Sequence, residues 1–173
     1  MFEGFDLTDF WKKSDYADKE YVSEPLTPEL LASVEHALKY KLPASYVALM
    51  QTQNGGIPKR TNHCTEPTSW AEDHIAITGI LGIAHGKENS VCGEFGSQFW
   101  IDEWGYPPIG VYFADCPSAG HDMVCLDYRE CGLAGEPKVV HVDQEFDFKI
   151  TFVAENFESF VRGLEDAEAF EEI

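Results

Sequence analysis

The segment of residues 107–129, PPIGVYFADCPSAGHDMVCLDYR, constrains the fold of this chain more than any other. Apolar side chains alternate with other side chains on both sides of its central CPSAG sequence, which is typical of β-strands. CPSAG has turn chemistry, because proline fixes φ and glycine tolerates positive φ. The segment therefore predicts an antiparallel hairpin with strands near residues 109–114 and 123–128. The alternating residues are Ile109, Val111, Phe113, Met123 and Cys125.

Ionisable side chains gather at the ends of these two expected strands. Asp115 ends the first strand, His121 and Asp122 open the second, and Asp127 lies near its end. Because a hairpin pairs its strands, we expect these groups to lie near one another. Carboxylates and imidazoles are ligands for divalent ions, but the spacing matches no zinc or EF-hand pattern. We therefore expect hydrogen bonds that fasten the turn, with Asp127 either paired to Arg129 or accepting from backbone donors, rather than a transition-metal site.

A cysteine nucleophile is the alternative enzymatic interpretation. The candidate thiols are those of Cys116 and Cys125, and the general base would be His121 or His141. Cys125 alternates with Met123 and is expected in the core, whereas Cys116 precedes a proline in the turn and is expected to be exposed. No motif of a known cysteine enzyme accompanies either thiol. We predict no catalytic residue and no cofactor.

Two helices are expected before the sheet. Thr27 is a good N-cap and Pro28 suits the first helical position, so one helix runs from there to about residue 40. A second is expected at residues 44–53, ended by Asn54-Gly55-Gly56 as a left-handed C-cap. A closing helix is expected at residues 155–164, before an acidic C-terminal tail that frays.

The remaining segments complete the prediction of the fold class. A short helix is expected to open at residues 6–11, and residues 99–104 are expected to form either a turn of helix or a short irregular segment. Residues 57–71 are expected to be irregular. Helices first, then strands, then a helix indicate an α+β fold: a mainly antiparallel sheet with two N-terminal helices and a C-terminal helix packed on it. We expect one domain over residues 26–173, preceded by an N-terminal arm over residues 1–25. Further strands are expected at residues 74–84, 138–142 and 148–153.

The charge of the chain excludes several classes of partner. Thirty-one acidic and 12 basic residues give a net charge of −19. Such a chain is repelled by nucleic acid and by anionic membranes, and it attracts basic proteins. The alternative interpretation is that the acidic residues only keep the protein soluble. The N-terminus does not resemble a secretory signal, and five cysteines without a CxxC pair indicate reduced thiols and a cytoplasmic location.

Several motifs occur together and in a fixed order: LPASY at 42–46, NGG at 54–56, GHDMVCLDYR at 120–129, GEPKVVHV at 135–142 and ENFESF at 155–160. With these motifs the sequence resembles the SMI1/KNR4 family, also called the SUKH superfamily, over about residues 26–164. The resemblance implies helices packed on a mainly antiparallel sheet and no enzymatic activity. It also implies, for bacterial members, an immunity protein that binds a toxin encoded beside it, often a nuclease. Eukaryotic relatives are regulators of cell-wall synthesis and signalling.

We therefore expect a binding module whose partner is a toxin with a basic surface. Tryptophans are enriched at binding hot spots, so Trp100 and Trp104 are candidate anchors. The alternatives are an intracellular scaffold or regulatory protein of the same fold, and an enzyme that binds a metal or small ligand in a pocket between Asp115 and Asp127. The oligomeric state does not follow from the sequence. The predicted partner-binding residues are Trp100, Trp104, Asp115, His121, Asp122, Asp127 and Arg129.

Overall fold

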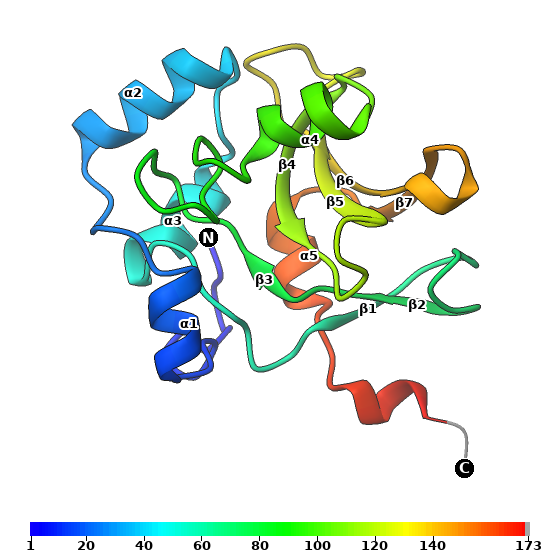
Figure 1. Cartoon of the computed structure of the whole chain (residues 1–173). Coiled ribbons are helices and arrows are strands. Elements are labelled where there is room, and N and C mark those ends of the chain that lie inside the picture. Colours follow the sequence, from blue (N-terminus) through cyan, green and yellow to red (C-terminus); the bar gives the residue numbers. More distant parts are fainter. Residues whose placement is uncertain (172–173) are drawn as a thin grey trace.

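A five-stranded antiparallel sheet forms the centre of the computed structural model, which describes residues 1–171 (Figure 1). The strands follow the order β3-β4-β5-β6-β7, and each pairs with its neighbour in antiparallel orientation. The α+β class with a mainly antiparallel sheet is confirmed. The strands are β3 (Gly79–Ile80), β4 (Gly110–Asp115), β5 (Asp122–Asp127), β6 (Lys138–Asp143) and β7 (Lys149–Ala154).

Helices surround this sheet, and a small second sheet lies beside it (Figure 1). The second sheet pairs β1 (Asn62–Cys64) with β2 (His74–Ala76). The sequence analysis missed β1, because three residues are too few for an alternation pattern to show. The helices are α1 (Asp15–Glu20), α2 (Pro28–Leu38), α3 (Ala44–Thr52), α4 (Ser97–Trp104) and α5 (Phe157–Arg162), with 3₁₀ turns η1 (Gln144–Phe146) and η2 (Ala167–Phe170).

The predicted hairpin is confirmed as β4 and β5, and both of its faces are buried. Alternate residues enter two separate cores, because α3 and α5 cover one face and α4 covers the other. Ile109 breaks the expected parity, since it precedes β4 and packs on the α4 side. The main core receives Val111, Phe113, Val124 and Leu126, and the second core receives Tyr112, Met123 and Cys125.

The NGG sequence after α3 does not form the predicted left-handed C-cap. The cap residue Gln53 is extended, with φ −165°. The side chain of Asn54 instead accepts a hydrogen bond from the backbone N–H of Ile83 at 2.7 Å and donates to its carbonyl at 3.0 Å. Gly55 has φ +93°, and a Cβ there would lie 2.5 Å from the Tyr21 carbonyl. The motif therefore fastens α3 to its neighbours through close backbone contact.

The two ends of the chain also differ from expectation. No helix forms at residues 6–11, because the Asp6 carboxylate accepts from the backbone N–H of Thr8 at 2.9 Å and closes a turn instead. At the other end Glu165 pairs with Asn62, and the ring of Phe170 stacks on His74. The predicted fraying is therefore wrong for residues 165–170, and residues 172–173 lie outside the described part. No helix within residues 1–171 has the length and hydropathy needed to cross a membrane.

The N-terminal arm belongs to the main core. Phe2, Phe10 and Trp11 are buried there among residues of α3 and α5. The indole N–H of Trp11 donates to Thr52 Oγ1 at 3.0 Å, which ties the arm to the end of α3.

Replacement of Trp11 by alanine should lower the free energy of unfolding by about 3–5 kcal/mol, because a large buried side chain leaves a cavity. Urea denaturation measures the change. Trp70→Ala is the matched control, since Trp70 is 42% exposed. Its effect should stay within about 0.5 kcal/mol. Equal effects for the two variants would show that the arm does not contribute to the core.

Candidate functional site

The predicted site residues do not lie together. Asp115 and Asp122 flank the turn of the hairpin, but Asp127 pairs with Gly110 at the opposite end of β5. Five steps along an extended strand place Asp122 and Asp127 about 17 Å apart. The expected pocket between Asp115 and Asp127 is therefore wrong, because Asp115 pairs with Met123 near the turn and Asp127 lies at the other end of the hairpin.

An aromatic pocket lies beside the turn of the hairpin, with a volume of about 320 Å³. Helix α4 supplies three of its rings, the loop before α4 supplies a fourth, and the turn of the hairpin supplies its small residues. Two predicted anchors and one predicted carboxylate thus meet in one hollow. We call this hollow the aromatic pocket; its lining residues are Asn89, Phe95, Phe99, Trp100, Trp104, Asp115, Cys116, Ala119 and Gly120.

Helix α4 places Trp100 and Trp104 on one face, because residues four apart are neighbours on a helix. Their ring centroids are 5.3 Å apart. The indole N–H of Trp100 donates to the carbonyl of Phe95 at 3.1 Å, which orients the ring. Gly120 has φ +99°, and a Cβ there would lie 2.7 Å from the Trp100 ring. Only glycine therefore lets the turn pass beneath the indoles.

Asp115 is the charged group of the aromatic pocket. Burial raises the pKa of its carboxyl to about 6, although a hydrogen bond from Tyr21 opposes this rise. The Tyr21 hydroxyl lies 2.8 and 3.0 Å from the two carboxylate oxygens. Within residues 1–171 Asp115 forms no ion pair. At neutral pH the pocket therefore holds a negative charge without a cationic partner.

His121 lies at the rim of the aromatic pocket. Its ring centroid is 5.7 Å from that of Trp104, edge to face. Its Nδ1 lies 2.5 Å from Glu145 Oε1 and 3.0 Å from Gln144 Oε1. Because its side chain is half exposed, His121 remains accessible to a partner.

Asp122 lies in the interior beside Cys116 and His141. His141 Nε2 is 2.7 Å from Asp122 Oδ2, and donor atoms of the three side chains lie within 4.8 Å of one another. Burial is the largest single influence on the Asp122 carboxyl and raises its pKa, but the interactions with His141, Ser118 and Cys116 together hold the pKa below its ordinary value. Cys116 is buried, which corrects its expected exposure, because the residue before Pro117 still belongs to the main core.

The Cys116 thiol is poorly suited to catalysis or to metal binding. Burial and the nearby charges of Asp122 and Asp115 raise its pKa well above the ordinary range. Both functions require the thiolate. The direct bond between His141 and Asp122 already engages the two other candidate ligands. The bond between Asp122 and His141, at the strand end next to the turn, is of the kind that was predicted to fasten the turn.

At the opposite end of β5, Asp127 pairs with Arg129 as predicted. The guanidinium Nε and Nη2 contact the two carboxylate oxygens at 3.0 and 2.7 Å. Lys138 lies 4.0 Å from the same carboxylate. Asp127 is buried, and the side chain of Arg129 is half exposed. The pair satisfies a buried carboxylate at the sheet end, and its role in partner binding stays a prediction.

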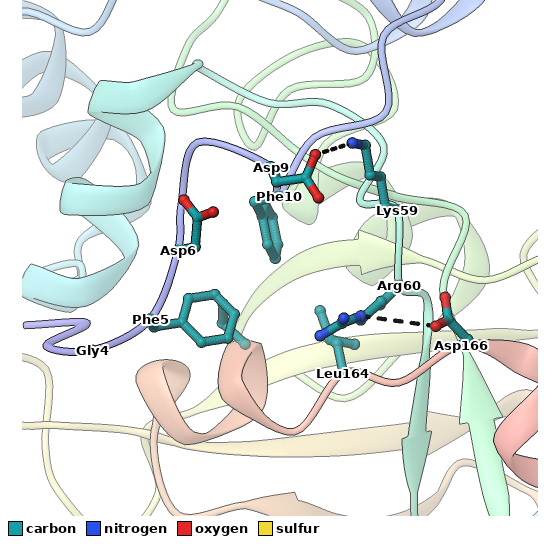
Figure 2. A pocket seen from close by; sticks show the side chains of 10 residues that line it. Gly4, Phe5, Asp6, Asp9, Phe10, Lys59, Arg60, Leu164 and Asp166 are labelled. Atoms are coloured by element: carbon teal, nitrogen blue, oxygen red, sulfur yellow. Dashed lines mark hydrogen bonds and ion pairs between the residues drawn. The ribbon is translucent and has the colours of Figure 1, made fainter.

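A second hollow, of about 410 Å³, lies between the N-terminal arm and the C-terminal segment (Figure 2). Figure 2 shows Phe5, Phe10 and Leu164 around its apolar part. At its rim Lys59 pairs with Asp9, and Arg60 lies 3.9 Å from Asp166. Because these charges are paired, we interpret this hollow as the contact through which the N-terminal arm packs on the rest of the domain. The aromatic pocket, with its unpaired carboxylate, is the candidate site.

The family model named SMI1 / KNR4 family (SUKH-1) matches residues 25–163, which is most of the chain. The chain belongs to the SMI1/KNR4 family. A comparison with curated proteins finds no match. The family includes immunity proteins, and the aromatic pocket lies inside the matched SUKH domain. Tyr21, which holds Asp115, lies outside it.

Sequence reasoning found the two tryptophans and Asp115 but missed Phe95, Phe99 and Gly120. The spacing of four between Trp100 and Trp104 was an available signal for one helical face. That Gly120 lies beneath these rings follows from tertiary packing and has no local signature.

Replacement of Asp115 by asparagine should stabilise the fold at neutral pH. The folded pKa of about 6 exceeds the ordinary aspartate value of 3.8, so the folded state binds more protons than the unfolded state between these two pH values. Any stability from this group is present below pH 4 and is lost as pH rises through 6. The gain in Asp115→Asn over wild type should therefore grow between pH 4 and 6, to about 1–3 kcal/mol. Urea denaturation across pH measures it, and a pH-independent difference would contradict the assignment.

The interior cluster should hold no stoichiometric transition metal, because its thiol is protonated and its histidine already bonds to aspartate. Elemental analysis of protein purified without a tag or a chelator tests this expectation. A stoichiometric metal that is lost in Asp122→Ala would overturn it and would favour the enzymatic interpretation.

Proposed function

We propose that this protein is a non-enzymatic immunity protein, which binds and neutralises a toxin encoded beside it, often a nuclease. The observation that carries the proposal is the aromatic pocket in a member of a family that includes immunity proteins. Exposed aromatic side chains around a hollow are the usual anchors of protein interfaces. Phe95 is 36% exposed, and Trp100 and Trp104 are partly exposed.

The charge around the aromatic pocket supports a basic partner. Residues 88–128, which build most of the pocket, contain seven acidic residues and no lysine or arginine. Lys87, just before this segment, donates to the backbone carbonyl of Lys19. A nuclease needs cationic groups to hold phosphates, so an acidic protein can occupy the same surface. The exposed acidic residues of this segment are Glu88, Glu94, Asp102 and Glu103.

The candidate catalytic groups are placed in a way that supports a non-enzymatic role. The Cys116 thiol is buried, and its pKa lies well above the ordinary range. Asp122 and His141 are buried and bond to each other. A substrate would have no access to either group in this arrangement.

An immunity protein acts in the cell that makes the toxin, so the proposal places this protein in the cytoplasm. All five cysteines are free, which fits a reducing compartment.

Co-expression with the product of the neighbouring gene should yield a complex and should protect the cells. Association should slow strongly as salt rises, because ions screen charges over about 8 Å at physiological ionic strength. Trp100→Ala or Trp104→Ala should mainly speed dissociation, by about 30-fold at a true anchor. Trp70→Ala is the control, because Trp70 is exposed but lies outside the aromatic pocket.

Three outcomes would count against the proposal. A complex whose association rate does not depend on salt concentration would contradict electrostatic attraction as the mechanism of association. Survival of cells that express the toxin alone would remove the immunity function. Absence of any complex would favour the scaffold or regulatory alternative.

A further inference from the structure

The aromatic pocket combines ring faces with one unpaired carboxylate. Phe95, Phe99, Trp100 and Trp104 form a continuous series in which successive ring centroids are 5.0–5.3 Å apart. Aromatic faces attract cations through the ring quadrupole, and tryptophan does so most strongly. An arrangement of this kind, with a carboxylate beside it, favours a positively charged group over an apolar one.

The position of Asp115 strengthens this preference. Its carboxylate is largely buried, is held by the Tyr21 hydroxyl and forms no ion pair within the described residues. An apolar group in the pocket would bury this charge further without a partner, which is costly. A cation would complete the pair. The nearest other ionisable groups do not supply one, since Cys116 is a neutral thiol and Asp122 bonds to His141.

We propose that the aromatic pocket takes the side chain of an arginine from the basic partner protein, with the guanidinium stacked on the indoles and paired with Asp115. The inference rests on the proposed function and specifies how that partner is recognised. Arginine fits better than lysine, because its planar guanidinium stacks on aromatic rings and presents several donors to a carboxylate. A volume of about 320 Å³ admits one long side chain. Phe95 of the lining is exposed, and the exposed Glu94 and Glu103 are sequence neighbours of Phe95 and Trp104, so a protein surface could make further contacts there.

The test uses a single amino acid derivative, so it does not depend on the toxin. N-acetyl-arginine methylamide is titrated into the full chain, and the indole N–H signals of the four tryptophans are followed by NMR. The Trp100 and Trp104 signals should shift, while those of Trp11 and Trp70 stay in place. The neutral isostere N-acetyl-citrulline methylamide should bind at least about tenfold more weakly, since it lacks the charge.

Two variants separate the charge from the rings. Asp115→Asn keeps the shape of the pocket and should weaken arginine binding about tenfold without changing citrulline binding. Binding to wild type should strengthen as pH rises through about 6, where Asp115 ionises, and should lose this dependence in Asp115→Asn. Trp70→Phe should leave the titration unchanged.

Equal binding of arginine and citrulline derivatives, or an unchanged affinity in Asp115→Asn, would overturn the proposal. A lysine derivative that binds as tightly as the arginine derivative would overturn the choice of arginine. Failure of this inference can be told from failure of the proposed function. If toxin binding is insensitive to Asp115→Asn, the proposed arginine contact is wrong and the proposed immunity function stands. If the arginine derivative binds but no toxin complex forms, the arginine site stands and the proposed immunity function is wrong.

Discussion

Burial of the β4–β5 hairpin on both faces is the constraint on which the rest of the structure depends. When neither face of a strand meets water, every side chain along it enters a core, and polar groups are tolerated only with partners. Each buried carboxylate of the sheet has at least one such partner, and only Asp122 Oδ1 among their oxygens lacks a hydrogen bond within the described residues. Asp122 bonds to His141, Asp127 accepts from Nε and Nη2 of Arg129, and Asp143 accepts two hydrogen bonds from Ser69. These groups hold the strand ends and leave little for external ligands.

Asp115 departs from the pattern. Its partner is the neutral hydroxyl of Tyr21, which donates one hydrogen bond and compensates no charge. Its position at the end of β4 also differs, because α4 covers this side of the sheet with aromatic rings that are only partly buried. One sheet thus carries two kinds of strand end. At one kind the carboxylate bonds to a neighbouring side chain of the protein. At the other kind the carboxylate of Asp115 has no ion pair within the described residues and lies beside partly exposed aromatic rings.

The sequence predicted those parts of the fold that have local signatures. Thr27-Pro28 marked the start of α2, and alternation marked the hairpin, since capping and side-chain period are properties of short segments. The prediction that Asp115 and Asp127 share a pocket was wrong, because strands of six residues place these two carboxylates at opposite ends of the hairpin. The role of Asn54 and the packing of the indoles over Gly120 could not be predicted, because each depends on contact between segments far apart in sequence.

The hydroxyl that holds Asp115 joins the aromatic pocket to a part of the chain outside the family match. Tyr21 lies before residue 25, where the family match begins, yet it contacts the charged group of the aromatic pocket. A substitution at this position changes the polarity of the pocket while the hairpin, its turn and α4 keep their sequences. Tyr21 is also buried in the main core, so a substitution there alters the packing of the core together with the pocket.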